Sequence, residues 1–224
     1  MKVIFDLDYT LLDTIKFKEA LAEIFKDLGL DINFEKNYNY LKKERGENFG
    51  LNIFIDFLKE NHEISEDMIK DIKIKCDELL RRIDGFLFPE AKRLLELLKR
   101  NGHEIILATF GRKGWQEQKV SGLSENVKEK FYQIIFEELD KSKGEFFENL
   151  VKEKESVIII NDNAKECLEM EQALGDRAEI YLLESKYSHN AKHDFKIYSL
   201  EQLCQYFENL FEHGQETKKE FKIA

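Results

Sequence analysis

The sequence predicts an α/β fold in which a doubly wound parallel sheet carries an inserted α-helical cap. Two observations lead to this prediction. Short apolar runs alternate along the chain with amphipathic helical patterns, and one long stretch with only helical patterns interrupts the alternation after the first run. Strands that alternate with helices favour a parallel sheet with right-handed crossovers and helices on both faces.

Five apolar runs are predicted to be buried parallel strands. Each is apolar mainly over consecutive positions, as expected for strands that helices cover on both faces. The runs are residues 2–5, 104–108, 132–136, 156–160 and 179–183. In sheets of this kind ligands bind beyond the carboxyl ends of the strands, so the residues that follow each run are candidates for function.

The helix that precedes the second run has clear boundaries. Pro89 stands near its start and Gly102 just past its end, where these residue types are favoured. Its apolar positions follow the i, i+3, i+4, i+7 spacing of a helix with one buried face. They are Ala91, Leu94, Leu95 and Leu98.

Residues 15–88 contain helical patterns and no convincing strand. Three apolar stripes mark them: Phe17, Leu21, Ile24, Phe25 and Leu28; Leu51, Phe54, Ile55 and Leu58; Ile69, Ile72, Cys76, Leu79, Leu80 and Ile83. Gly29 closes the first stripe, and Ser65 opens the third as a helix N-cap. The sequence therefore predicts a core of residues 1–14 and 89–211, a helical cap of residues 15–88 that covers the strand ends as a lid, and a polar tail of residues 212–224.

Composition restricts the class of protein. The 224 residues suffice for one α/β core with an insertion or for two small domains. With 35 Lys and Arg against 45 Asp and Glu, the net charge of −10 argues against a general nucleic-acid-binding protein, but not against phosphate esters as substrates. The three cysteines are scattered and indicate buried side chains in a reducing compartment.

The apolar runs give no sign of export or of a membrane. The first run is broken at Asp6, and no run approaches the roughly twenty residues that span a bilayer. We therefore expect a cytoplasmic protein with no membrane and no nucleic-acid partner. Its oligomeric state is open.

Two carboxylates, Asp6 and Asp8, follow the first apolar run, and Thr10 comes two residues later. Both carboxylates leave the strand end on the same side, because strand side chains alternate between faces. Like charges so close are unfavourable unless a cation lies between them or one is protonated. The pattern suits a strand end that binds Mg²⁺ and holds one carboxylate as a nucleophile, although acidic residues are also common in turns.

Polar groups also follow two other predicted strands. Thr109 and Phe110 end the second run, where a hydroxyl and free backbone N–H groups can hold phosphate oxygens. Asp162 follows the fourth run and could complete an oxygen-rich Mg²⁺ site with Asp6, or it could cap a helix.

Lys143 lies in a capping box that Ser142 and Glu145 form, in the pattern Ser-x-x-Glu. This places the lysine in the first turn of a helix, where it opposes the helix dipole. The local conflict indicates a role such as neutralising an acidic or phosphate-filled site. Lys141 is a second candidate for that role.

The order of these groups resembles the haloacid dehalogenase-like (HAD) superfamily, whose core is a Rossmann-like sheet. The groups Asp6-x-Asp8-x-Thr10, Thr109, Lys143 and Asp162 each fall at the matching place in the strand–helix alternation. The segment FPEAKRLLELLKRNGHEIILATFG looks like the helix and strand that lead into that family's second motif. The resemblance covers roughly residues 1–205, and four ordered motifs are specific where any one alone is weak.

The resemblance implies a phosphatase that works through an aspartyl-phosphate. Asp6 would attack phosphorus. Asp8 would protonate the leaving oxygen and then activate the water that hydrolyses the intermediate. Phosphoryl oxygens would be held by Thr10, Thr109, Phe110 and Lys143, and Mg²⁺ by the Asp6 carboxylate, the main-chain carbonyl of Asp8 and Asp162.

The chain departs from the family's pattern at two positions. Asn161 stands where relatives often carry Gly or an acid, and Gly144 follows Lys143 where Pro is frequent. An amide binds Mg²⁺ more weakly than a carboxylate. Whether Asn161 or Glu166 contributes to the metal site is therefore open.

Three other classes of protein can be compared with these motifs. Two of them explain the motifs less well, and a phosphomutase explains them equally well. A receiver domain carries its phosphorylated Asp on a later strand and has no helical lid after the first. A non-catalytic phospho-ligand-binding protein would be expected to have lost at least one of Asp6, Asp8, Lys143 and Asp162, and none is lost. A phosphomutase of the same superfamily shares every catalytic residue.

The cap is expected to select the substrate, a small phosphorylated metabolite that the sequence does not identify. Lys42, Lys43 and Arg45 form a basic cluster there that could bind a second anionic group, although such a run is more often a solvated helix end.

Overall fold

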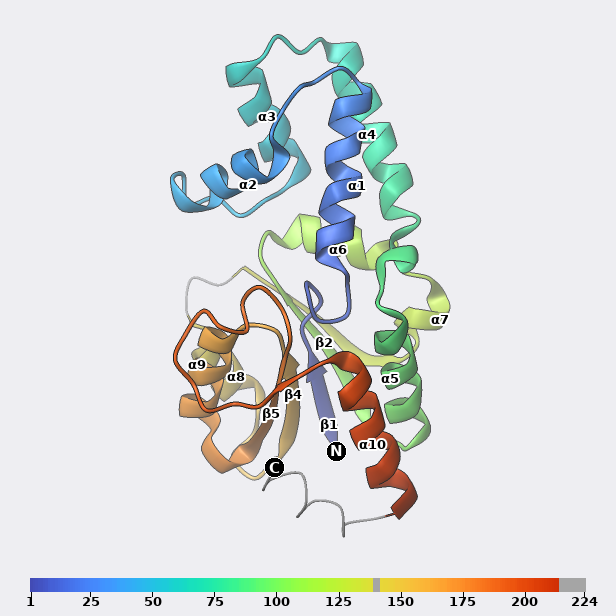
Figure 1. Ribbon diagram of the computed structural model, residues 1–224, viewed down its shortest axis with the longest axis vertical. Helices are drawn as coiled ribbons and strands as arrows, with labels where there is room; N and C mark the ends of the chain where they lie inside the picture. Colours follow the sequence, from blue (N-terminus) through green and yellow to red (C-terminus); the bar gives the residue numbers. More distant parts are fainter. Residues whose placement is uncertain (139–141, 214–224) are drawn as a thin grey trace.

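Six parallel strands form one sheet in the order β3-β2-β1-β4-β5-β6, in the computed structural model, which describes residues 1–138 and 142–213 (Figure 1). The strands are β1 (Lys2–Phe5), β2 (Glu104–Phe110), β3 (Phe131–Glu137), β4 (Val157–Asn161), β5 (Ala178–Leu183) and β6 (Ile197–Tyr198). The predicted parallel α/β sheet is confirmed. The five predicted strands are present within two residues of their expected bounds, and the short edge strand β6 was not predicted.

The helices lie in two groups. Those next to the sheet are α5 (Pro89–Arg100), α6 (Lys113–Ser121), α7 (Glu125–Lys128), α8 (Lys143–Leu150), α9 (Ala164–Leu174) and α10 (Leu200–His213), with a short 3₁₀ turn, η2 (Gly175–Arg177). Those between β1 and α5 are α1 (Thr14–Asp27), α2 (Phe34–Lys43), α3 (Leu51–Asn61), α4 (Glu66–Leu80) and the 3₁₀ turn η1 (Ile83–Phe86).

Strand residues alternate between two apolar cores, one on each face of the sheet. In β1, Val3 and Phe5 pack into the core that includes Leu94 of α5 and Phe207 of α10. Ile4 between them packs into the other core, which includes Phe147 of α8 and Met170 of α9. Because both faces are covered, the strands are apolar at consecutive positions, as the sequence indicated.

The central strand fixes where the candidate residues emerge. Lys2 of β1 pairs with Glu104 on one side and with Val157 on the other, so β1 lies between β2 and β4. Strand order reverses at this point, and the carboxyl ends of neighbouring parallel strands there form a crevice where ligands bind. Asp6, the residue after β1, is held in this crevice by a hydrogen bond from its backbone N–H to the carbonyl of Ile160.

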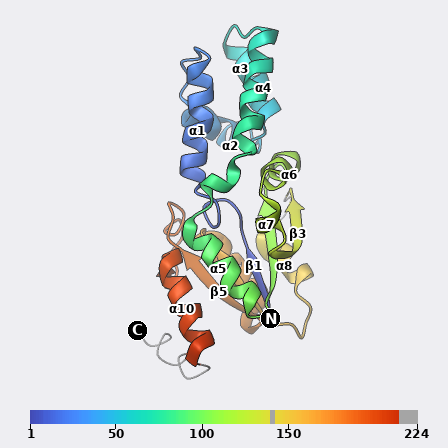
Figure 2. The ribbon, with the colours of Figure 1, turned by 90° about the vertical axis from the view of Figure 1, so that its right-hand side faces the viewer.

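Helices α1–α4 form an insertion that stands beyond the carboxyl ends of the strands (Figures 1 and 2). The predicted apolar stripes form its interior, where Phe25 and Phe54 pack with ring centroids 5.2 Å apart. Asn33 and Ser65 cap α2 and α4 by accepting hydrogen bonds from backbone N–H groups of their first turns. The α-helical insertion is therefore present, although α2 was not predicted as a separate helix.

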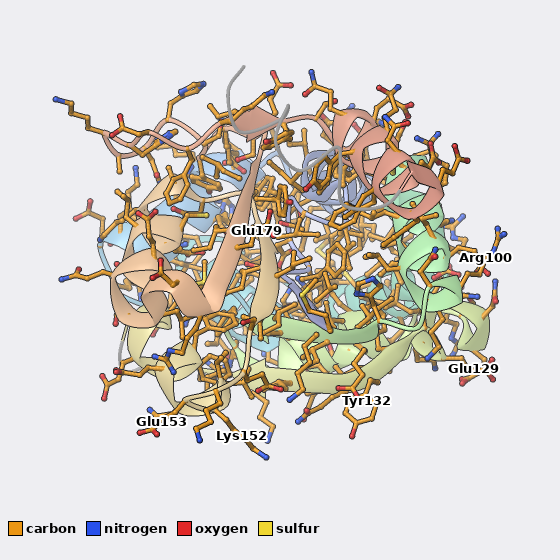
Figure 3. The ribbon with its side chains drawn as sticks, turned by 90° about the horizontal axis from the view of Figure 1, so that it is seen from below. Arg100, Glu129, Tyr132, Lys152, Glu153 and Glu179 are labelled. Carbon is orange, nitrogen blue, oxygen red and sulfur yellow. The ribbon has the colours of Figure 1, made fainter. Side chains whose placement is uncertain are left out.

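The insertion also contacts the core near α6 and α7. Asp84 of η1 accepts a hydrogen bond from the backbone N–H of Ser124 (3.1 Å), just before α7. Gly122, which ends α6, approaches α4 so closely that a Cβ there would lie 2.1 Å from the carbonyl oxygen of Leu80. The opposite end of the sheet carries outward-pointing charged side chains such as Arg100 and Lys152 (Figure 3).

None of the helices in the described residues combines the length and the apolar character that crossing a membrane requires.

Candidate active site

A cavity of about 300 Å³ lies between the helical insertion and the carboxyl ends of the strands. It is lined by residues from the loop after β1, from α1 and α2, from α6 and from the segments that follow β2 and β4. Five of the residues singled out from the sequence line it together: Asp6, Asp8, Phe110, Lys143 and Asp162. Four chain segments far apart in the sequence thus converge on one volume of small-molecule size.

The loop after β1 is a tight turn that requires an unusual backbone. Tyr9, between Asp8 and Thr10, has φ of 60°, the left-handed region that a bulky residue rarely adopts. The turn is held by hydrogen bonds from the backbone N–H groups of Leu11 and Leu12 to the carbonyl of Leu7, at 3.0 and 2.9 Å. Strain of this kind persists where the surrounding structure enforces it, and it clusters at functional sites.

Lys143 links two carboxylates at the floor of the cavity. Its ammonium nitrogen lies 2.7 Å from Oδ2 of Asp6 and 2.6 Å from Oε2 of Glu166, and 4.1 Å from the ring centre of Phe110. Burial lowers the pKa of Lys143, but the charges of Asp6 and Glu166 outweigh burial and raise it above its usual value. Lys143 is therefore a fixed positive charge beside Asp6.

The position of Lys143 depends on how α8 begins. Ser142 caps α8 by accepting a hydrogen bond from the backbone N–H of Glu145, as the capping box predicted. Gly144 lies against α9, where a Cβ would be 2.5 Å from the carbonyl oxygen of Glu169. This close approach explains why Gly follows the lysine, since a larger residue would push α8 and Lys143 away from Asp6.

Three side chains hold Asp8. Lys119 lies 2.5 Å from its Oδ2, and Gln116 donates a hydrogen bond of 3.2 Å to the same oxygen. The hydroxyl of Thr14 donates to Oδ1 at 3.1 Å. Burial raises the pKa of Asp8, but Lys119 and these hydrogen bonds outweigh burial, so the pKa lies below its usual value. Asp8 is accordingly ionised in this arrangement.

The two candidate threonines lie beneath the cavity and do not line it. Thr109 is fully buried, and its hydroxyl donates a hydrogen bond of 2.9 Å to Oε1 of Gln116. Thr10 is fully buried too, and its hydroxyl has no hydrogen-bond partner among the described residues. Their assignment as phosphate ligands stays a prediction.

Asp162 has the surroundings of a cation ligand. Burial, together with the nearby charge of Asp6, raises the pKa of Asp162 to about 7. Its Oδ2 is buried and finds no hydrogen-bond partner among the described residues. Burial likewise raises the pKa of Asp6, and Lys143 compensates only in part. Negative charge at these two strand ends is therefore not fully balanced by the protein.

The donor set fits Mg²⁺ better than a softer metal. No three His, Cys, Asp or Glu side chains gather to hold a metal ion anywhere in residues 1–138 and 142–213. Mg²⁺ commonly binds through only one or two carboxylates, with water completing its shell, and Asp6 and Asp162 supply that number. Of the two residues left open, Glu166 pairs with Lys143, while Asn161 accepts a hydrogen bond from the backbone N–H of Asn163 (2.8 Å) and does not line the cavity.

The sequence did not indicate Gln116 and Lys119. Both are polar residues on α6, and such residues usually face solvent. One signal could have found them: at helical spacing, Gln116 and Lys119 fall on the same face as Trp115 and Val120, and all four are buried. A helix with two polar residues inside its apolar face places them where they need partners.

The basic cluster predicted in the insertion is divided in the structure. Lys42 lines the cavity, whereas Lys43 does not. Arg45 pairs with Glu47 and Glu60, at 3.5 and 3.0 Å. Lys141, the second candidate for the lysine role, lies outside the described residues.

Solved structures of several hydrolases share this fold. A predicted haloacid dehalogenase-like hydrolase from Burkholderia xenovorans LB400 is 13% identical, with a TM-score of 0.68 over 91% of this chain and 94% of that one. A predicted β-phosphoglucomutase from Thermotoga maritima is 19% identical, with a TM-score of 0.61 over 93% and 99%. The predicted HAD-hydrolase YfnB from Bacillus subtilis, described bound to magnesium, is 16% identical, with a TM-score of 0.63 over 92% and 97%.

These identities show a shared fold and nothing finer. No curated protein is significantly similar to the chain. The sequence itself matches the family model of haloacid dehalogenase-like hydrolases over residues 3–198, which is most of its length. The protein therefore belongs to the haloacid dehalogenase-like hydrolase family.

Proposed function

We propose that the protein is a Mg²⁺-dependent phosphatase that hydrolyses a small phosphorylated metabolite through an aspartyl-phosphate on Asp6. One observation carries the proposal. The carboxylates of Asp6 and Asp162 line a single cavity together with the buried ammonium of Lys143, which lies 2.7 Å from Asp6. Asp6 can act as the nucleophile, Lys143 supplies a fixed positive charge, and the carboxylates of Asp6 and Asp162 can together hold a cation. Phosphoryl transfer uses groups of these kinds.

In the first step, Asp6 supplies the nucleophile. An oxygen of its carboxylate forms a bond to phosphorus while the bond from phosphorus to the ester oxygen breaks. Asp8, which must first take up a proton against the charge of Lys119, gives that proton to the departing oxygen, which leaves as an alcohol. The fixed charge of Lys143 offsets the charge that builds on the transferring group.

In the second step, Asp8 takes a proton from water. The water oxygen attacks phosphorus, the bond from phosphorus to Asp6 breaks, and inorganic phosphate is released with the Asp6 carboxylate restored. The contacts of Asp8 with Lys119 and Gln116 suit this step, since they stabilise its ionised form.

Other residues bind and orient in this proposal. Thr10, Thr109 and Phe110 shape the place of the phosphoryl group, with the hydroxyl of Thr109 acting through Gln116. Asp6, the main-chain carbonyl of Asp8, and Asp162 would hold Mg²⁺, which would supply positive charge that offsets the charge of the phosphate. Residues 15–88 act as the cap that selects the substrate.

The decisive experiment compares the wild type with Asp6→Asn on p-nitrophenyl phosphate, with MgCl₂ or with excess chelator. The amide cannot act as the nucleophile. It removes charge without changing the shape of the side chain, so we expect the circular dichroism spectrum of the variant to match that of the wild type. We expect turnover of the variant below about one per cent of the wild type. Higher turnover by Asp6→Asn, or full wild-type activity after exhaustive chelation, would contradict the proposal.

A phosphomutase is the second candidate, because one of the similar solved structures is described as a β-phosphoglucomutase. The two functions differ in where the phosphoryl group goes. Released inorganic phosphate in stoichiometry with substrate loss identifies a phosphatase. Transfer to a second hydroxyl of a sugar phosphate, with little free phosphate, identifies a mutase.

A further inference from the structure

Lys18, on α1, presents a buried ammonium group to the cavity. The side chain is 11% exposed, and its nitrogen lies 3.4 Å from the ring centre of Tyr38 and 5.8 Å from that of Tyr9. It donates no hydrogen bond to any described residue. Its one ion pair is a loose contact of 3.7 Å with Glu35. A buried ammonium with three donors and no acceptor is costly for a protein to keep.

The surroundings of Lys18 disfavour its charged form. The pKa of Lys18 is lowered to about 8, mainly by burial; Lys186 and Lys42 also lower it, while Glu35 and Asp8 raise it. Glu35 does not line the cavity and is shared with Lys186, at 3.4 Å. The acidic partner therefore approaches Lys18 from outside the cavity, and no described acidic residue that lines the cavity forms an ion pair with it.

Two more cations line the cavity without acidic partners. Lys42 of α2 and Arg112, just before α6, form no ion pair with any described acidic residue. The side chain of Arg112 reaches the insertion at Gly50. A Cβ added at Gly50 would lie 2.7 Å from the Cδ of Arg112. The other two cations that line the cavity, Lys119 and Lys143, are paired with carboxylates. Positive charge without an acidic partner thus collects where α1, α2 and the start of α6 line the cavity.

We propose that the cavity takes a phosphate monoester with a second anionic group, and that Lys18 binds that group with Lys42 and Arg112. This inference rests on the proposed function, which assigns the phosphoryl group to Asp6 and Lys143. The cavity of about 300 Å³ limits the substrate to a small molecule. The aromatic rings around Lys18 exclude water, which strengthens a charged contact there.

The second group is a carboxylate or a second phosphate, and the substrates of the test separate the two. One series consists of ω-phosphooxy carboxylates with one to four methylene groups. The matched neutral series consists of n-alkyl phosphates of the same lengths, and the third of the corresponding bisphosphates. For each length, kcat/KM of the anionic ester is divided by that of the neutral ester. We expect the wild type to favour one anionic series by about tenfold or more at its best length.

The variant Lys18→Met keeps the length of the side chain and removes the charge. Because the ammonium is buried without an acceptor, the change is expected to leave the fold intact. The preference for anionic esters should fall by about tenfold or more, mainly through KM. Lys42→Met should lower it as well. Its neighbour Lys43→Met, on the same helix but not lining the cavity, is the matched control and should leave the preference unchanged.

A second measurement does not depend on turnover. Phosphonate analogues, with a methylene in place of the ester oxygen and a terminal carboxylate, phosphonate or methyl group, are titrated calorimetrically into wild type and Lys18→Met, both in the presence of MgCl₂. The wild type should bind the analogue whose terminal anion matches the preferred ester series at least tenfold more tightly than the analogue with the methyl group, and Lys18→Met should not.

The outcomes separate this inference from the proposed function. If neutral esters are hydrolysed through Asp6 but no anionic series is preferred, the inference is wrong and the phosphatase proposal stands. An equal preference in Lys18→Met and wild type also overturns it. If no phosphate ester of any series is hydrolysed or transferred, both proposals fall together.

Discussion

The ammonium nitrogen of Lys119 lies 2.5 Å from Oδ2 of Asp8, and both side chains belong to the core rather than to the insertion. The contact ties α6 to the turn after β1. It holds the candidate acid and base in one position and stabilises its ionised form. Asp8 is therefore prepared to accept a proton, and to donate one it must first be protonated against the charge of Lys119.

We predict that Lys119→Met shifts the pH dependence of kcat. Without the ammonium, burial is the dominant influence on Asp8, so its pKa rises. The limb of the pH profile that reports Asp8 should move to higher pH, and kcat at neutral pH should fall. Lys119→Arg keeps the charge and should restore part of both. A profile identical to that of the wild type would show that Lys119 does not act on Asp8.

Asp162 should make the metal-free protein less stable as the pH rises. Its folded pKa of about 7 lies above the ordinary value of about 4 for an aspartate, so the folded state binds the proton more tightly than the unfolded state. The stability that this proton contributes is present at low pH and is lost between about pH 4 and pH 7.

Thermal unfolding in excess chelator measures this effect. The melting temperature of Asp162→Asn should fall less between pH 5 and pH 7.5 than that of the wild type, because the amide has no proton to lose. Addition of MgCl₂ at pH 7.5 should stabilise the wild type and have a smaller effect on the variant. If the melting temperatures of the two proteins depend equally on pH, Asp162 is not the group whose pKa is raised in the folded state.

Lys143→Met should cost both activity and stability. The lysine neutralises Asp6 and Glu166. Its loss also removes the positive charge that offsets the negative charge of the transferring phosphoryl group, which typically costs about 100-fold or more in kcat. Removing one partner of a buried ion pair costs about 3–5 kcal/mol.

A second substitution separates the two effects of Lys143→Met. In the double variant Lys143→Met/Asp6→Asn, the carboxylate of Asp6 that lost its ion pair is also removed. The free energy of unfolding in urea should therefore recover in part, while activity should not. Lys141→Ala should cost far less activity than Lys143→Met. If Lys141→Ala is the damaging change, the lysine of the site has been assigned two residues too late.

Gly122→Ala should destabilise the protein, since a Cβ at this position would lie 2.1 Å from the carbonyl oxygen of Leu80. Either α4 or α6 must shift, and overpacking of this kind costs about 1–3 kcal/mol. Gly85→Ala is the control, because no atom lies within 4 Å of the added Cβ. Urea midpoints measure both. If Gly85→Ala is the more damaging of the two, η1 depends on glycine for a reason other than space.

The strands were the most predictable part of the fold. Runs such as Val3-Ile4-Phe5 are apolar because helices cover both faces of the sheet, and this leaves a direct trace in the sequence. Segments with little buried area were missed. In α2 only Phe34 and Leu41 are buried, and β6 has two residues with none fully buried, so neither leaves a clear periodic pattern.

The candidate site was predictable where residues follow strands and not where they depend on helix packing. The sequence placed Asp6, Asp8 and Asp162 at strand ends, and the structure shows all three around one cavity. The contacts of Lys119 with Asp8 and of Lys18 with Tyr38 depend on how α6 and α1 are rotated. That rotation follows from tertiary packing, and the local spacing alone does not fix it.

The central place of β1 has a consequence for how the chain folds. This strand is the first to be synthesised, yet its two neighbours, β2 and β4, are encoded far downstream, so that Lys2 pairs with Glu104 and Val157. Contacts between residues so distant in sequence form slowly, because a long loop must close before they contribute. The turn with Asp6 and Asp8 cannot be fixed until β4 has emerged from the ribosome. The helices α1–α4 belong to one continuous segment of the chain, Thr14–Leu80, so they can pack together earlier. The insertion is therefore assembled before the turn that carries Asp6 and Asp8.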